Sequence, residues 1–178
     1  PSKSGNLKLI YLSLIAEKKN LLFLLNIINS TENVSLDIYG PVKDIAYWNK
    51  CKKVINKMSG KVKYCGTLLP SDVQHVLSTY HSLILLTRGE NFGHALYESL
   101  SVGRPIITSH YTPWNNLKNN CAGWNVDIKL IEDCTAAVEE LNEMSDSDYA
   151  SCCEGAFELA SNYYYSLNTG ETYRRLFA

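Results

Sequence analysis

The stretch that decides the fold runs from residue 83 to residue 108. It reads Leu83-Ile-Leu-Leu-Thr-Arg-Gly-Glu-Asn-Phe-Gly93-His-Ala-Leu-Tyr-Glu-Ser-Leu-Ser-Val-Gly103-Arg-Pro-Ile-Ile-Thr108. Its first five residues form an apolar run of strand length, which is typical of a central strand buried on both faces. Residues 93–102 predict a helix, because Gly103 stands at a natural C′ position and a proline follows two residues later. Residues 105–108 predict a further buried strand.

The rest of the chain alternates in the same way between short apolar runs and longer helical patterns. The expected strands are residues 7–12, 34–39, 61–65, 83–87, 105–108 and 123–126. The expected helices are residues 20–28, 43–58, 71–80, 93–102, 133–144, 147–164 and 169–177. This alternation predicts an α/β fold, in which a parallel sheet is covered by helices on both faces. Such sheets bind ligands beyond the C-terminal ends of their strands, so the residues after each strand are the candidates for a site.

Length and composition favour one globular domain and exclude several classes of protein. The chain has 178 residues, of which 46% are hydrophobic and 20% are charged, as in ordinary soluble domains. Its 17 basic and 18 acidic residues leave a net charge of -1, so no overall basic field predicts nucleic acid as a partner. A local basic stripe has two interpretations, a solvated helix face or a weak contact with a membrane surface. It consists of Lys50, Lys52, Lys53 and Lys57.

The cysteines and histidines predict neither disulfides nor a metal centre. The six cysteines include no Cys-x-x-Cys pair, and His75, His81 and His110 lack the spacing of a metal site. Six free thiols are typical of a reducing compartment, so we expect a cytoplasmic protein. No apolar run approaches the roughly 20 residues that cross a bilayer. Residues 1–6 are interpreted as a linker.

The loop and helix after the most apolar strand carry the candidate site. Gly93 has no side chain, so a ligand can approach the backbone closely there. The amides of Gly93, His94 and Ala95 are the free donors at the start of the helix, and they suit a phosphate or diphosphate. Glu98 lies about one and a half turns into this helix, where it can accept hydrogen bonds from sugar hydroxyls. Glu90 precedes the helix; both glutamates can equally be solvated surface charges.

The same segment resembles the glutamate signature of family 4 glycosyltransferases. The resemblance rests on Glu90-x7-Glu98 within Glu-Asn-Phe-Gly-His, followed by Glu98-Ser-Leu-Ser-Val-Gly-Arg-Pro-Ile-Ile. It extends in register over residues 7–127, and Thr112-Pro113-Trp114 and Gly123-Trp124 are similar to bacterial members that build surface polysaccharides. Members of this family are retaining enzymes of the GT-B fold that use nucleotide sugars without a metal. The resemblance therefore implies a Rossmann-like sheet that forms the C-terminal, donor-binding half of such an enzyme.

The resemblance also implies roles for individual residues. Glu98 would bind the ribose of the nucleotide, and Glu90 would lie beside the transferred sugar as a catalytic residue. The segment around the helix start would contact the sugar hydroxyls and the diphosphate; it comprises Asn91, Phe92, Gly93, His94 and Ala95. The remaining implied contacts are a cleft wall at Gly40 and Pro41 and the nucleotide base at Thr67 and Leu68. Trp114 and Trp124 are interpreted as packing residues, with stacking on a base or sugar as the alternative.

One position departs from the family pattern. Members carry an arginine after the first strand and a lysine five residues later, and both hold the donor diphosphate. Lys19 aligns with the lysine and is expected to bind the donor and stabilise the leaving group, but Leu14 stands at the arginine position. Loss of one such donor typically costs about 2.7–4 kcal/mol of barrier. Arg88 and Arg104 are candidates to supply the positive charge that Leu14 lacks.

The expected function follows from these residues and from the resemblance. We expect residues 7–164 to be the donor-binding domain of a retaining glycosyltransferase, and residues 165–178 to form a helix that packs toward an N-terminal acceptor-binding domain. The expected partners are a nucleotide sugar and a glycan or lipid-linked acceptor, with neither metal nor other cofactor. The expected location is the cytoplasm, including the inner face of the membrane. The alternatives are a non-catalytic nucleotide-sugar-binding or scaffolding domain, or another GT-B activity such as a sugar epimerase.

Overall fold

Six parallel strands form one sheet in the order β3-β2-β1-β4-β5-β6. A computed structural model describes residues 6–58 and 60–168, and for residues 167 and 168 it describes the backbone only. The strands are β1 (Leu7–Leu12), β2 (Val34–Tyr39), β3 (Val62–Gly66), β4 (Ser82–Leu85), β5 (Ile106–Ser109) and β6 (Gly123–Val126). All six lie where the sequence predicts a strand, and the α/β fold with an all-parallel sheet is confirmed.

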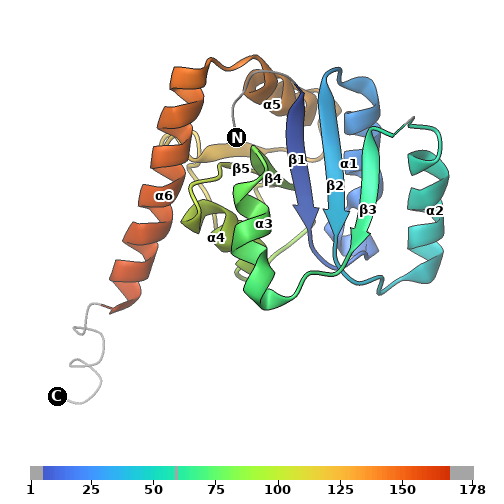
Figure 1. The fold of residues 1–178 in the computed structure, drawn as a ribbon, viewed down its shortest axis with the longest axis horizontal. Helices are drawn as coiled ribbons and strands as arrows, with labels where there is room; N and C mark the ends of the chain where they lie inside the picture. Colours follow the sequence, from blue (N-terminus) through green and yellow to red (C-terminus); the bar gives the residue numbers. More distant parts are fainter. Residues whose placement is uncertain (1–5, 59, 169–178) are drawn as a thin grey trace.

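Helices cover both faces of this sheet (Figure 1). One group packs together on one face: α1 (Leu21–Ser30), α2 (Ile45–Ile55) and α5 (Ile131–Glu143). The other group comprises α3 (Val73–Ser78), α4 (His94–Ser101) and α6 (Asp146–Asn168). Two short 3-10 turns, η1 (Glu17–Lys19) and η2 (Pro70–Asp72), precede α1 and α3. None of the helices in the described part of the chain is long and apolar enough to cross a membrane.

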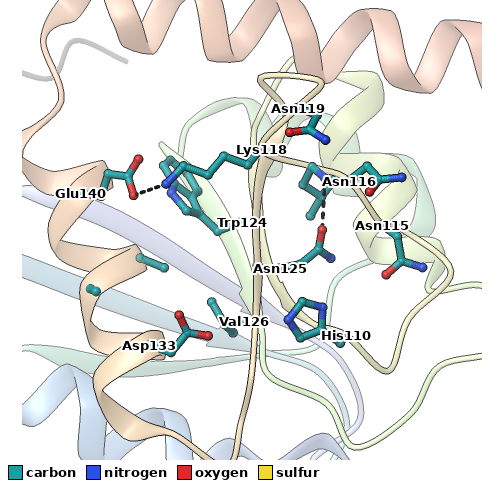
Figure 2. Close-up of a pocket in the computed structure, with 13 residues that line it drawn as sticks. His110, Asn115, Asn116, Lys118, Asn119, Trp124, Asn125, Val126, Asp133 and Glu140 are labelled. Carbon is teal, nitrogen blue, oxygen red and sulfur yellow. Dashed lines mark hydrogen bonds and ion pairs between the residues drawn. The ribbon is translucent and has the colours of Figure 1, made fainter.

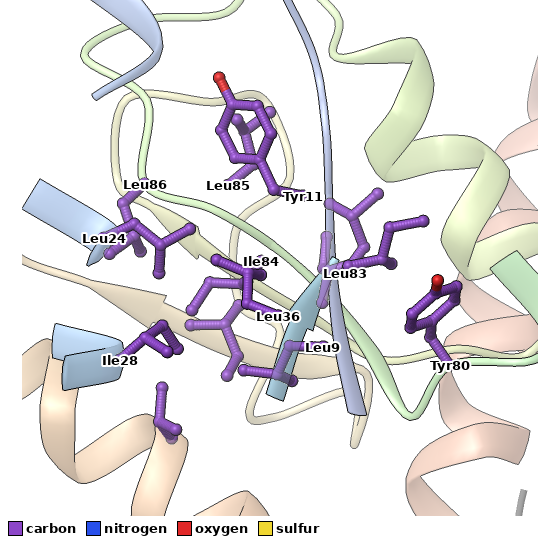
Figure 3. Packing of buried hydrophobic residues seen from close by; sticks show 14 of the residues in the cluster. Leu9, Tyr11, Leu24, Ile28, Leu36, Tyr80, Leu83, Ile84, Leu85 and Leu86 are labelled. Atoms are coloured by element: carbon purple, nitrogen blue, oxygen red, sulfur yellow. The ribbon is translucent and has the colours of Figure 1, made fainter. Parts of the chain in front are cut away.

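The core lies between the central strands and the helices on either side. Leu9 and Ile10 on β1 and Ile84 on β4 are completely inaccessible to solvent, as expected for strands that are buried on both faces. Leu24 and Ile28 of α1 pack toward this sheet from one side (Figure 3). This burial explains why continuous apolar runs, rather than alternating patterns, mark the strands in the sequence.

Several element boundaries differ from the sequence prediction, most of them by one or two residues. The strand expected at residues 83–87 ends at Leu85, because Thr87 turns its hydroxyl to Lys18 O (3.3 Å) and accepts a hydrogen bond from Gly89 N (3.2 Å). The helix expected to end at residue 164 continues as α6 to Asn168, so residues 165–168 belong to α6. The helix expected at residues 169–177 lies outside the described residues.

Candidate functional site

The strand order creates a switch point between β1 and β4, and we call the junction of the loops that follow these two strands the crevice. These strands are direct neighbours, with Leu9 opposite Ser82 and Ile10 opposite Leu83. From β1 the chain continues to β2 on one side, and from β4 it continues to β5 on the other side. The loops that follow them meet, since Arg88 N donates to Lys18 O (2.9 Å). In doubly wound sheets such a switch point is where ligands bind. Candidate residues from the two loops are therefore brought to one place.

Lys19 and Glu90 form an ion pair across this crevice. Lys19 Nζ contacts Glu90 Oε1, although 71 residues separate the two in sequence. Both side chains are mostly buried, with 16% and 14% of their surfaces exposed. The backbone of Glu90 is held in turn, because its amide donates to Tyr111 O (2.9 Å) in the loop after β5. The site thus offers a cation and a carboxylate in fixed positions, at the point where the sequence predicts the donor diphosphate and the transferred sugar.

Gly93 forms the turn that starts α4. Its φ of +78° lies in the left-handed region, and a Cβ there would meet Leu96 Cδ1 at 2.8 Å. Leu96 N and Tyr97 N both donate to Gly93 O, at 2.9 and 3.1 Å, so the helix begins directly after the glycine. The amides of His94 and Ala95 precede these first hydrogen bonds of the helix. They are donors at the positive end of the helix dipole, as the sequence predicts for an anion site.

Glu98 is a half-buried carboxylate on α4. The described part of the chain contains no hydrogen-bond or ion-pair partner for its carboxylate. Burial raises the pKa of Glu98 above its ordinary value, and the nearby His94 opposes this shift. A carboxylate that is partly removed from water and without a protein donor can accept hydrogen bonds from a ligand with hydroxyl groups.

An aromatic cluster anchors the loop that carries Glu90 and Gly93. We use this name for Phe92, Tyr97, Trp114 and Tyr163. The Phe92 ring lies 5.5 Å from the rings of both Trp114 and Tyr163, and Tyr97 stacks on Trp114 at 5.8 Å. Trp114 Nε1 also donates to Phe92 O (2.7 Å). Trp114 is 5% exposed, which confirms its interpretation as a packing residue. The sequence provides no signal for the contribution of Tyr163, because α6 comes to this loop only through the tertiary fold.

The neighbouring strand ends carry the other predicted cleft residues. Gly40 has a φ of +136°, and a Cβ there would overlap Ser13 O at 1.9 Å, so β2 can pass the β1 loop only with a glycine. Gly40 N donates to Gly66 O (2.8 Å), which ties the ends of β2 and β3 together. Pro41 and Thr67 are exposed and Leu68 is half-buried. These residues therefore follow β2 and β3 at the end of the sheet that also holds the crevice.

Leu14 lies on the β1 loop with 40% of its surface exposed. Its carbonyl accepts a hydrogen bond from the Tyr11 hydroxyl (3.0 Å), but its side chain offers nothing to an anion. Arg88 is in the crevice loop, exposed, with Nη1 3.8 Å from Glu17 Oε1. Arg104 lies elsewhere, since it follows α4 and donates to Ser78 O (3.0 Å). Of the two candidates to compensate for Leu14, only Arg88 is placed near the crevice.

A cavity of about 490 Å³ lies away from this crevice, between β6, α5 and the loop after β5 (Figure 2). His110, Trp124 and Asn125 are among its lining residues, and Lys118 Nζ pairs with Glu140 Oε2 (3.0 Å) at its rim. None of the predicted donor-site residues lines it. Within residues 6–58 and 60–168, no cluster of three histidine, cysteine or acidic side chains could hold a metal ion. All six cysteines are free thiols, as predicted.

The family follows from a comparison of the sequence with family models. Residues 6–144 match the model described as Glycosyl transferases group 1, which covers most of the chain. The chain belongs to this family. The solved structures that it resembles identify the fold as that of a GT-B glycosyltransferase domain, as the sequence motif indicates. No curated protein matches the sequence significantly.

Three solved structures illustrate how this glycosyltransferase domain compares with its relatives. HepE from Anabaena, in complex with UDP and glucose, has 14% identity and a TM-score of 0.76, over 90% of this chain and 45% of that one. A glycosyltransferase from Rickettsia africae has 17% identity and a TM-score of 0.80, over 89% and 44%. Sucrose-phosphate synthase from Thermosynechococcus elongatus has 15% identity and a TM-score of 0.81, over 99% and 47%. The chain thus spans less than half the length of each of these proteins.

Proposed function

We propose that the chain is the donor-binding domain of a retaining glycosyltransferase. It would transfer a sugar from a nucleoside diphosphate sugar to a glycan or lipid-linked acceptor in the synthesis of bacterial surface polysaccharide. The observation that carries this proposal is the Lys19–Glu90 ion pair, which lies at the β1–β4 switch point. A cation, a carboxylate and a free helix N-terminus suit one ligand that combines a diphosphate with a sugar. The HepE structure with UDP and glucose is consistent with this class of ligand.

Each part of the crevice has a distinct role in this proposal. The Lys19 ammonium and the amides of His94 and Ala95 neutralise the diphosphate, so no metal is required. Glu98 accepts hydrogen bonds from the ribose hydroxyls, and Glu90 lies beside the transferred sugar. The base lies farther along the sheet edge, where Gly40, Pro41, Thr67 and Leu68 line the cleft.

The chemical contribution of the domain is positioning and charge stabilisation. The bond from the anomeric carbon to the diphosphate breaks, and its electron pair leaves with the diphosphate. The acceptor oxygen forms the new bond on the same face, and its proton passes to the departing phosphate oxygen, so the configuration is retained. Lys19 and the start of α4 stabilise the charge that develops on the leaving group. The acceptor would come from an N-terminal domain, and this chain alone would bind nucleotide without transferring sugar.

Isothermal titration calorimetry with UDP, GDP and ADP tests the proposal. We expect the chain to bind at least one of them, Glu98→Ala to lose that binding, and Glu158→Ala to retain it. Glu158 is the matched control, because it is an exposed glutamate on α6, away from the crevice. Absence of binding by all three nucleotides would contradict the donor-site assignment. Sugar transfer by the isolated chain would contradict the proposal that a second domain must bind the acceptor.

Leu14 favours a second candidate, a domain that binds the nucleotide sugar without catalysing transfer. An exposed leucine stands where the family pattern has a cation, so the leaving group lacks one stabilising donor. This candidate predicts that the full-length protein binds nucleotide with Glu98-dependent affinity and releases no nucleoside diphosphate from the donor. Detectable release would exclude it.

A further inference from the structure

The charge of the chain is strongly segregated, although its sum is close to zero. Residues 40–70, called the basic sector here, contain seven lysines and one aspartate, a local charge of +6. The rest of the chain has ten basic and seventeen acidic residues, a charge of -7. The single acid of the sector, Asp44, caps α2, where its Oδ1 accepts a hydrogen bond from Tyr47 N (2.9 Å). The field of this sector is therefore almost entirely that of its lysines.

The basic sector forms one outer edge of the molecule. It comprises α2 and β3, and β3 is the edge strand of the sheet (Figure 1). Lys50 and Lys53 share one face of α2, and Lys57 continues that face beyond the helix. Six of the seven lysines are exposed, and within the described residues none of these six takes part in an ion pair: Lys43, Lys50, Lys52, Lys53, Lys57 and Lys63. The seventh, Lys61, donates to Thr31 O.

The opposite side of the domain is acidic. Residues 131–168, which form α5 and α6, contain nine acidic residues and no lysine or arginine. Helix α5 packs beside β6, the strand at the other edge of the sheet, and α6 lies on the side of the molecule away from α2 (Figure 1). The molecule thus has a charge dipole directed across the sheet. Near a surface with negative charge, this dipole turns the α2–β3 edge toward the surface.

Two large apolar side chains are exposed in the same sector. Ile45, at the start of α2, is 71% exposed, and Leu69, in the loop after β3, is 67% exposed. The basic sector contains no arginine, the residue that recognises nucleic acid most often. A sector that exposes both lysines and aliphatic side chains matches a phospholipid surface, where anionic headgroups lie over an apolar layer.

We propose that the basic sector docks the domain on a membrane surface rich in anionic phospholipid, with the acidic helices facing away. Ile45 and Leu69 follow the C-terminal ends of β2 and β3, at the same end of the sheet as the crevice. In the docked orientation the crevice, which begins at β1, lies two strands or roughly 10 Å from the docked edge of the sheet. A lipid-linked acceptor would then be within reach; this last consequence rests on the proposed function, whereas the docking does not.

Vesicle cosedimentation tests the docking. The chain is incubated with vesicles of pure phosphatidylcholine and with vesicles that also contain phosphatidylglycerol, at low and at high salt. The test variant combines Lys50→Gln, Lys53→Gln and Lys57→Gln. The control variant combines Lys8→Gln, Lys118→Gln and Lys129→Gln, which removes the same charge from exposed positions outside the sector. Circular dichroism verifies that both triple variants are folded.

We expect binding only to the phosphatidylglycerol vesicles, and we expect high salt to release it. The test variant should bind about 100-fold more weakly, because each lysine near an anionic surface contributes roughly a fivefold factor. The control variant should bind like the wild type. Equal weakening of both variants would show that net charge alone attracts the chain, and would overturn the proposal. So would equal binding to both kinds of vesicle, or binding to single-stranded nucleic acid in preference to vesicles. Nucleotide titrations on the same variants separate this result from the proposed function, because none of the six lysines is a predicted donor-site residue.

Discussion

The substitution Gly93→Ala tests whether the left-handed turn before α4 shapes the donor site. An alanine at the observed φ of +78° pays a backbone cost of about 1–2 kcal/mol. Its Cβ would also lie 2.8 Å from Leu96 Cδ1 and 3.3 Å from Leu96 Cγ. Leu96 is completely buried, so it cannot move aside cheaply, and overpacking of this kind costs about 1–3 kcal/mol. The expected loss of unfolding free energy is therefore about 2–5 kcal/mol.

Gly60→Ala is the matched control for the backbone cost. Gly60 has the same φ of +78°, but a Cβ there would meet no atom within 4 Å. Urea unfolding followed by circular dichroism should show only this backbone cost, about 1–2 kcal/mol, for this variant. The difference between the two glycine variants then isolates the contact with Leu96.

Two further measurements test the contact with Leu96 and the link between this turn and nucleotide binding. Leu96→Ala removes the atoms that clash, so the double variant should be more stable than the sum of the single losses predicts, by about 1–3 kcal/mol. Gly93→Ala should also weaken nucleotide binding in calorimetry, because relief of the contact shifts the first amides of α4. Equal losses for the two glycine variants, or unchanged nucleotide affinity in Gly93→Ala, would refute this reasoning.

Four other substitutions give independent tests. Glu98→Gln should stabilise the free chain at neutral pH and abolish nucleotide binding. Burial raises the pKa of Glu98, so the charged form opposes folding; the gain should vanish below the ordinary glutamate pKa of about 4.3, as pH-dependent urea unfolding can show. Trp114→Phe should cost about 1 kcal/mol in the same assay, because it removes the hydrogen bond to Phe92 O. Trp124→Phe should be neutral or stabilising, because the buried Trp124 Nε1 has no partner within the described residues. Leu14→Arg should raise affinity for UDP about tenfold, as one added charge-assisted hydrogen bond implies, and leave that for uridine unchanged in calorimetry.

Much of the fold can be predicted from the sequence because the strands are buried on both faces. A continuous apolar run such as residues 83–87 marks a central strand without any knowledge of its neighbours. Gly103 and the proline after it likewise mark the end of α4 through local chemistry. Element ends are less predictable where a tertiary contact decides them, as when the Thr87 hydroxyl contacts the carbonyl of Lys18 and β4 ends early.

The candidate site is predictable residue by residue but not as an arrangement. The motif around Glu90 and Glu98 points to their chemistry, yet nothing in the sequence pairs Glu90 with Lys19. That contact depends on β1 lying next to β4, which is a property of the strand order. The contribution of Tyr163 is hidden for the same reason, because the turn of α6 that carries it meets Phe92 only in the folded chain.

The Lys19–Glu90 pair also affects the free energy with which an anion can bind. In the free domain the ammonium is already neutralised by a mostly buried carboxylate, so a diphosphate must share or displace that partner. Breaking such a pair is costly unless the released carboxylate finds new hydrogen bonds. The hydroxyls of a transferred sugar would supply them, whereas a free nucleotide would not. Under the proposed function, the pair would therefore favour a complete nucleotide sugar over the nucleoside diphosphate that remains after transfer, and this difference would help product release.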